Sequence, residues 1–278
     1  MTSILPKILY GTAWKEDRTR ELVRLAIEQG FRGIDTANQR KHYHEAGVGE
    51  AIQDAIEKDL VTREDLFLQT KFTFRGGQDH RLPYDPSAST AEQVEQSFAS
   101  SLMHLGVETI DSYVLHGPSQ SRGLGANDWE AWKAMEVIQK SGRTRFLGIS
   151  NCSLEQLTTL VKHCELKPRF VQNRCYAVHA WDRSVREFCR SNDIVYQGFS
   201  LLTANAKVLT HPQVVQLARK YDCHVAQIIF SFAIGIGMLP LTGTTNPQHM
   251  LIDLELGHLQ LDPIELAMIE TVNAANSC

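Results

Sequence analysis

The chain has 278 residues, of which 43% are hydrophobic and 22% charged, proportions that favour a folded globular protein over a disordered one. Its net charge of −4 offers no positive field for nucleic acid or anionic lipid. No apolar run approaches the ~18 residues of a membrane span, and the first six residues do not resemble a secretion signal, so we expect a cytoplasmic protein.

Short apolar segments alternate with longer amphipathic segments along the whole chain. In residues 16–30, for example, Leu22, Val23, Ala26 and Ile27 recur at helical spacing. The expected pairs of strand and helix are 7–11 with 16–30, 32–35 with the helix that begins at 48–52, 65–71 with 91–105, 110–116 with 129–140, 145–149 with 154–163, 170–172 with 183–190, 194–199 with 213–221, and 238–241 with the last helices.

Eight strands, each followed by a helix, require parallel strands joined by right-handed crossovers. We predict an α/β fold, a (β/α)8 TIM barrel that occupies residues 1–278 as a single domain, because such barrels need ~250 residues. An open doubly wound sheet is the alternative. The glycine-rich dinucleotide turn that would follow its first strand is missing, since Gly11-Thr-Ala-Trp14 stands there.

Three of the predicted strands end in an ionisable residue. Asp35, Lys71 and His116 fall at the ends of the second, third and fourth strands, and the loop after Asp35 delivers Tyr43. In a closed parallel barrel these ends meet at one mouth, where active sites of this architecture lie. The four residues predict a catalytic site, with a purely structural ion-pair network as the alternative.

Seven short motifs occur at or near strand ends. They are Gly33-Ile-Asp35-Thr-Ala, Tyr43 before Val48-Gly-Glu-Ala-Ile52, Thr70-Lys71, Asp111-Ser-Tyr113-Val-Leu-His116, Gly148-Ile-Ser150-Asn151, Gln172-Asn173 and Phe199-Ser-Leu-Leu202. Each motif alone occurs by chance, but seven in this order are specific. On these residues the chain resembles an aldo-keto reductase along nearly its whole length.

The resemblance implies a catalytic set of Asp35, Tyr43, Lys71 and His116, acting with a nicotinamide cofactor in the reversible reduction of an aldehyde or ketone to an alcohol. Hydride addition places negative charge on the carbonyl oxygen, which a nearby acid must neutralise. Tyr43 would be that acid, and the Lys71 ammonium would lower the pKa of its phenol. Asp35 would hold the lysine, and His116 would hydrogen-bond the substrate oxygen or the tyrosine hydroxyl.

The resemblance also implies cofactor-binding residues on the later strands. Ser150, Asn151 and Gln172 carry the donors and acceptors that a carboxamide needs, and Phe199 would stack on the nicotinamide ring. The other predicted cofactor-binding residues are Ser200, Leu202, Thr242, Gly243, Thr244 and His249. Asn246 would cap a helix beside them, and the free amides of its first turn suit a phosphate.

The sequence departs from the family pattern near both ligands. Asp35 and Tyr43 are further apart than is usual, and Leu241 stands where members specific for NADP often carry a lysine. On family habit we expect NADP(H), and the missing cation leaves NAD(H) as a possible cofactor.

Four residues are predicted to shape the substrate pocket. Gly117 stands where many relatives carry a tryptophan, which predicts a wider mouth, and Trp14, Phe74 and Tyr84 are the lining candidates. The last two lie in a long loop over residues 72–89. We expect a small-molecule carbonyl or alcohol as the partner, with no nucleic acid and no membrane, and a monomeric protein.

The six cysteines show no Cys-x-x-Cys pair, so we expect free thiols in a reducing compartment and no metal site. Two other functions compete with reduction: a cofactor-binding regulatory barrel of the same family with little turnover, and a barrel lyase or isomerase that uses no nicotinamide. The complete set of predicted catalytic residues argues against the regulatory alternative.

Overall fold

The computed structural model describes residues 5–272 and contains a closed barrel of eight parallel strands. The strands are β1 (Leu9–Gly11), β2 (Gly33–Asp35), β3 (Phe67–Phe72), β4 (Ile110–Leu115), β5 (Thr144–Ser150), β6 (Phe170–Arg174), β7 (Val195–Phe199) and β8 (Met238–Thr242). Each strand pairs with the next, and β8 pairs with β1 to close the ring. The predicted (β/α)8 barrel is confirmed.

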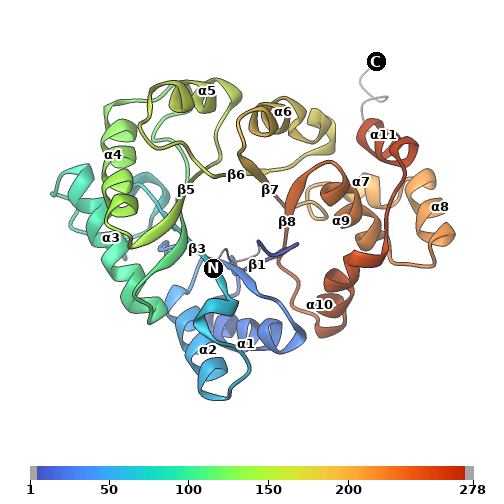
Figure 1. The fold of residues 1–278 in the computed structure, drawn as a ribbon, viewed down its shortest axis with the longest axis horizontal. Coiled ribbons are helices and arrows are strands. Elements are labelled where there is room, and N and C mark those ends of the chain that lie inside the picture. The colour runs from blue at the N-terminus through green and yellow to red at the C-terminus, as the bar shows by residue number, and fades with distance from the viewer. Residues whose placement is uncertain (1–4, 273–278) are drawn as a thin grey trace.

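Helices surround the strands in chain order, so that α1 and α10 lie side by side where the ring closes (Figure 1). The helices are α1 (Thr19–Gln29), α2 (Glu45–Glu57), α3 (Thr90–Leu105), α4 (Ala126–Lys140), α5 (Leu154–His163), α6 (Arg183–Ser191), α7 (Ala206–Leu209), α8 (Pro212–Lys220), α9 (Val225–Gly235), α10 (Pro247–Leu254) and α11 (Pro263–Thr271). Within residues 5–272, none of them has both the length and the apolar character to cross a membrane.

The expected helices agree with the structure except between β7 and β8. Helix α5 spans residues 154–163 as predicted, whereas α9 was not anticipated. Its residues 228–233 are all buried and mostly apolar, so the segment lacks the exposed polar face that α1 and α5 present.

Alternate side chains of each strand point into the barrel and form layers. Phe67 and Phe170 meet edge to face, with ring centroids 5.5 Å apart, in an apolar cluster that also holds Leu239. Two positions later on the same strands, Gln69 and Gln172 replace the phenylalanines. The interior therefore changes from an apolar layer to a polar layer toward the carboxyl ends of the strands.

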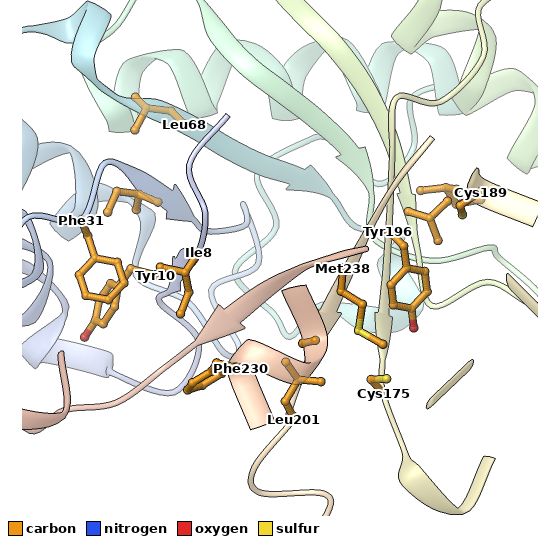
Figure 2. Packing of buried hydrophobic residues seen from close by; sticks show 14 of the residues in the cluster. Ile8, Tyr10, Phe31, Leu68, Cys175, Cys189, Tyr196, Leu201, Phe230 and Met238 are labelled. Atoms are coloured by element: carbon orange, nitrogen blue, oxygen red, sulfur yellow. The ribbon is translucent and has the colours of Figure 1, made fainter. Parts of the chain in front are cut away.

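A larger hydrophobic core lies between the strands and the surrounding helices. Figure 2 shows two parts of it: Tyr10 beside Phe31, with ring centroids 5.4 Å apart, and Tyr196 beside Met238, its register partner on β8. Burying a side chain of this size contributes roughly 1.5–3 kcal/mol. This core fixes the helices and leaves the loops at the mouth to carry the chemistry.

The close packing of α2 on α3 depends on a glycine. A Cβ at Gly49 would lie 1.9 Å from the carbonyl oxygen of His104, so any other residue would push the helices apart. Helix α3 itself begins at a capping box in which Ser89 accepts from the amide of Glu92 at 3.3 Å. Because α2 begins two residues after Tyr43, this packing also restrains the loop that carries Tyr43.

Candidate active site

A cavity of about 870 Å³ opens at the carboxyl ends of the strands. It has the volume of a small-molecule or cofactor site and lies where barrels of this architecture place their chemistry. The predicted site residues that line it are Trp14, Asp35, Tyr43, His116, Ser150, Asn151, Gln172, Phe199, Ser200, Leu202, Thr242, Gly243, Thr244 and His249. Lys71 is fully buried and reaches the cavity through its partner Asp35.

Lys71 and Asp35 form a buried ion pair between β3 and β2. The Lys71 ammonium donates to both carboxylate oxygens of Asp35 at 2.7 Å and to the carbonyl oxygen of Thr36 at 2.8 Å, which uses all three of its protons. Burial lowers the pKa of Lys71, while the carboxylates of Asp35 and Glu45 act in the opposite direction. Such a pair is stable only with this geometry, because either charge alone would be desolvated at high cost.

Three glutamines extend this pair across the interior of the barrel. Gln69 and Gln172 donate to Asp35 Oδ1 at 2.7 Å and 3.0 Å, and both also donate to Gln197 Oε1. Gln197 returns a hydrogen bond to Gln69 at 3.0 Å. The carboxylate of Asp35 is thus held directly from β3 and β6, and Gln197 on β7 orients the two glutamines that bind it.

Tyr43 lies over this ion pair at one end of the cavity. Its ring centroid is 5.2 Å from the Lys71 ammonium and 5.9 Å from the His116 ring. Desolvation and the Asp35 carboxylate raise the pKa of Tyr43, the opposite direction from the sequence-based expectation. The expectation fails because desolvation of the buried phenol dominates, and Lys71 directs its three protons to other oxygens, so the phenol stays neutral at ordinary pH.

His116 follows β4 and faces Tyr43. Its Nδ1 lies 2.7 Å from the hydroxyl oxygen of Thr73, the residue that follows β3. Burial and the Lys71 charge lower the pKa of His116 to about 3, so the imidazole is neutral. A neutral imidazole and a neutral phenol therefore share one wall of the cavity.

The ends of β5 and β6 bring amide and hydroxyl groups to the cavity. Asn151 donates its Nδ2 to the His116 carbonyl oxygen at 2.8 Å and to Ser150 Oγ at 3.1 Å. Ser150 in turn donates to the carbonyl oxygen of Gln172 at 2.6 Å. In the part of the chain that the structure describes, Asn151 Oδ1 has no hydrogen-bond partner, so it is available to a ligand.

The other end of the cavity lies beside β8 and the start of α10. Asn246 caps α10 by accepting from the amides of Gln248 and His249. Lys15 donates to the Gly243 carbonyl oxygen at 2.8 Å, and burial together with the charge of Arg18 lowers its pKa to about 8. This end therefore offers hydroxyls, a helix N-terminus and a lysine to an anionic ligand.

Three non-glycine residues that line the cavity have positive φ: Trp14 at 62°, Asn151 at 51° and Ser200 at 57°. This conformation is unfavourable for a residue with a side chain, above all for one as bulky as tryptophan. Backbone strain of this kind concentrates at functional sites, so its position supports the assignment of the cavity.

Of the four residues predicted to shape the substrate pocket, only Trp14 lines the cavity. Its side chain is 69% exposed and stacks on His42, with ring centroids 4.0 Å apart. Phe74 and Tyr84 instead pack on Phe72 beneath the long loop. Gly117 leaves room beside Asn151, whose Cβ lies 3.5 Å from the position that a Cβ of residue 117 would take.

Several residues of the site had not been anticipated from the sequence: Lys15, Arg174, His224 and Asp253 in the lining, Gln69 and Gln197 beneath it, and Thr73 beside His116. The glutamines carried a visible signal, because each interrupts an apolar strand at an inward position. Arg174 is the last residue of β6, and the others lie in loops or in α10, where spacing alone does not bring them to the mouth.

The cysteines contribute no ligand set. Cys152, Cys175 and Cys189 are buried free thiols, and Cys164 and Cys223 are half-buried free thiols, while Cys278 lies outside the described residues. Among residues 5–272, no group of three or more His, Cys, Asp or Glu side chains is placed to hold a metal ion.

Comparison with known proteins shows which family the chain resembles. The family model described as Aldo/keto reductase family matches residues 7–274. The aldo-keto reductase AKR2E4 of Bombyx mori is 31% identical over 279 residues, which cover 95% of this chain and 86% of the relative. An uncharacterized oxidoreductase of Bacillus subtilis (strain 168), YtbE, is 29% identical over 251 residues, which cover 90% and 82%. The crystal structure of AKR2E4 in complex with NADP matches with a TM-score of 0.82 and 27% identity, covering 96% of this chain and 89% of that chain.

Proposed function

This chain belongs to the aldo/keto reductase family, and we propose that Tyr43, Lys71, Asp35 and His116 are the residues with which it carries out the family reaction. That reaction is the NAD(P)H-dependent reduction of an aldehyde or ketone to an alcohol, which is reversible. The observation that carries the proposal is the convergence of Tyr43 and His116 on one wall of the cavity, with the Lys71 ammonium 5.2 Å from the Tyr43 ring.

The cavity suits a nicotinamide dinucleotide at both ends. Asn151 has a free acceptor for a carboxamide, and Phe199 offers an apolar ring for stacking beside it. At the far end, the hydroxyls of Thr242 and Thr244 with Lys15 and His249 suit phosphates. When bound, the reduced nicotinamide supplies the hydride. We assign NADP(H) as the cofactor, in line with the AKR2E4 structure, which holds NADP.

Tyr43 supplies the proton in this proposal. As hydride reaches the carbonyl carbon, negative charge develops on the oxygen, and the phenol neutralises it by proton transfer. The raised pKa of Tyr43 keeps the phenol protonated at ordinary pH, which favours reduction over alcohol oxidation. The Lys71 charge stabilises the phenolate that remains, and Asp35 holds that charge in position.

His116 binds the substrate oxygen from the other side. Since burial and Lys71 keep its imidazole neutral, it acts as a hydrogen-bond donor of fixed position and does not compete with Tyr43 as the acid. The exposed ring of Trp14, stacked on the half-buried ring of His42, accepts the remainder of an apolar or aromatic carbonyl compound.

The test combines turnover with binding. The protein is mixed with NADPH and a panel of aldehydes and ketones, and the absorbance of the reduced nicotinamide is followed; in parallel, NADPH and NADH are titrated while protein fluorescence is recorded. We expect turnover on at least one aldehyde and tighter binding of NADPH. Binding without turnover across the panel would support the regulatory alternative, and a failure to bind either cofactor would overturn the assignment of the cavity.

We further propose that the chain acts as a single domain over residues 1–278, as a monomer, and in the cytoplasm. Within residues 5–272, the closed barrel leaves no sheet edge at which a second copy could add a strand. The free buried thiols of Cys152, Cys175 and Cys189 suit a reducing compartment. Light scattering coupled to size exclusion would measure the oligomeric state, with a mass near 31.3 kDa expected for a monomer.

A further inference from the structure

Among the residues that the structure describes, the hydroxyl of Thr73 has one hydrogen-bond partner, the proposed substrate-binding histidine. Thr73 follows β3 directly and is 6% exposed, and its Oγ1 lies 2.7 Å from Nδ1 of His116 at the end of β4. Only one hydrogen can lie between these two atoms. If this hydrogen is bonded to Oγ1 of Thr73, the neutral His116 carries its proton on Nε2. If it is bonded to Nδ1, Nε2 is unprotonated.

This hydrogen is covalently bonded to Oγ1 of Thr73, for the following reason. If Nδ1 carried the proton and donated it, the buried hydroxyl hydrogen of Thr73 would need another acceptor, and the described residues provide none. An unsatisfied buried donor is costly, whereas a hydroxyl that donates to an unprotonated Nδ1 satisfies both atoms. Burial and the Lys71 charge also hold His116 neutral, with its pKa lowered to about 3, so one ring nitrogen must be unprotonated.

We propose that Thr73 is a positioning residue that fixes His116 in the tautomer with the proton on Nε2, so that His116 presents a donor to the substrate oxygen. The proposal deepens the role given above to His116 and rests on it. In the other tautomer, Nε2 would present a lone pair to the negative charge that develops on that oxygen. His116 would then destabilise the transition state.

The long loop after β3 holds Thr73 in place. The Thr73 carbonyl oxygen accepts from the Tyr84 hydroxyl at 2.9 Å and from Gln78 Nε2 at 3.3 Å. Gln78 also donates to the Asn38 carbonyl oxygen at 2.9 Å, which ties this loop to the loop that carries Tyr43. Residues 72–89 therefore contribute to the site indirectly, because they fix the backbone of Thr73.

The most direct readout is spectroscopic and needs no substrate. In protein labelled with ¹⁵N-histidine, the chemical shifts of the two ring nitrogens and their couplings to ring protons distinguish the tautomers, and His116→Gln identifies the signals. We expect a protonated Nε2 and an unprotonated Nδ1 in the wild type. A protonated Nδ1 would overturn the proposal, whatever the activity of the enzyme.

Three variants connect the tautomer to the reaction. Thr73→Val keeps the shape and removes the hydroxyl; we expect mixed His116 tautomers and a fall in kcat of about tenfold to a hundredfold, with little change in KM or NADPH affinity. Thr73→Ser restores the hydroxyl and should restore the tautomer and kcat. Ser101→Ala, on α3, removes a buried hydroxyl that has no hydrogen-bond partner and should leave both unchanged.

The outcomes separate this proposal from the one on which it rests. If Thr73→Val retains the wild-type tautomer and kcat, Thr73 does not position His116. If His116→Gln retains full turnover while the wild type shows the Nε2 proton, the role of His116 in catalysis is wrong and the tautomer assignment stands. Should Thr73→Val fold poorly, as judged by thermal melting, the wild-type spectrum and Thr73→Ser still decide the question.

Discussion

The two halves of the barrel mouth are built differently. On the side of β2, β3 and β4, Asp35 and Lys71 are 3% and 0% exposed and form a network in which the three Lys71 protons are used. On the side of β8 and α10, the half-buried Thr244 and the exposed His249 of α10 line the cavity, and the cap of Asn246 on α10 is exposed.

The difference follows from what each half has to do. Proton transfer requires donors fixed to within fractions of an ångström, which a buried, fully bonded network provides. A dinucleotide must enter and leave, and a solvated surface of hydroxyls and amides permits this at modest cost. We therefore expect changes on the first side to act on stability and turnover, and changes of solvent-exposed residues on the second to act mainly on affinity.

Replacing Lys71 with Met should have the largest effect. The variant leaves Asp35 buried without its cation, which typically costs 3–5 kcal/mol of unfolding free energy, and it removes the charge beside Tyr43. Urea unfolding would measure the loss, and NADPH consumption should fall below detection. Adding Asp35→Asn should recover most of the stability without recovering turnover, whereas His249→Gln on the other side should leave stability unchanged. Equal losses of unfolding free energy in Lys71→Met and His249→Gln would contradict the difference between the two sides of the mouth.

Replacing Asp253 should raise the free energy of unfolding, because the folded state destabilises the ionised form of this carboxyl. It is 2% exposed on α10, accepts from the Thr242 hydroxyl at 2.6 Å, and burial raises its pKa to about 6. The folded state therefore binds its proton more tightly than the unfolded state, and stability is lost as pH rises from about 4 to about 6. Asp253→Asn should add up to roughly 3 kcal/mol at pH 8 and nothing at pH 3, measured by denaturant unfolding. A loss of stability at pH 8 would contradict this account.

Lys15 should make cofactor affinity depend on pH. Its pKa is lowered to about 8 by burial and by Arg18, so the ammonium that faces the dinucleotide end is lost as pH rises through 8. The Kd for NADPH should rise by about three- to tenfold between pH 7 and pH 9. Lys15→Met should bind NADPH more weakly at pH 7 and show a flat profile by fluorescence titration. If the Kd for NADPH still rises with pH in Lys15→Met, another group causes the pH dependence.

The barrel could be predicted from the sequence because its signals are local. Alternating strands and helices with a stop such as Gly30 fix the topology, and parallel strands then force Asp35, Lys71 and His116 to one mouth. Helix α9 could not be recognised because residues 228–233 are buried and mostly apolar, which leaves no polar face to mark a helix.

The finer structure of the site could not be predicted in the same way. Gln69 and Gln197 are 128 residues apart on strands that are not neighbours, and they meet only across the barrel interior. Thr73 and Tyr84 gain their positions from one loop conformation, and the direction of the Tyr43 pKa depends on how deeply the phenol is buried and how near it lies to Asp35. Contacts of this kind depend on side-chain geometry, which spacing along a sequence does not encode.

The central claim is that Tyr43 is the proton donor, and a single-turnover experiment tests it most directly. Wild type and Tyr43→Phe are each loaded with NADPH and mixed rapidly with a substrate aldehyde from the panel, and the first turnover is followed through the reduced nicotinamide. The account predicts that the rate in Tyr43→Phe falls by about 10²–10⁴-fold while the NADPH affinity is retained. A first turnover at the wild-type rate in Tyr43→Phe would contradict it.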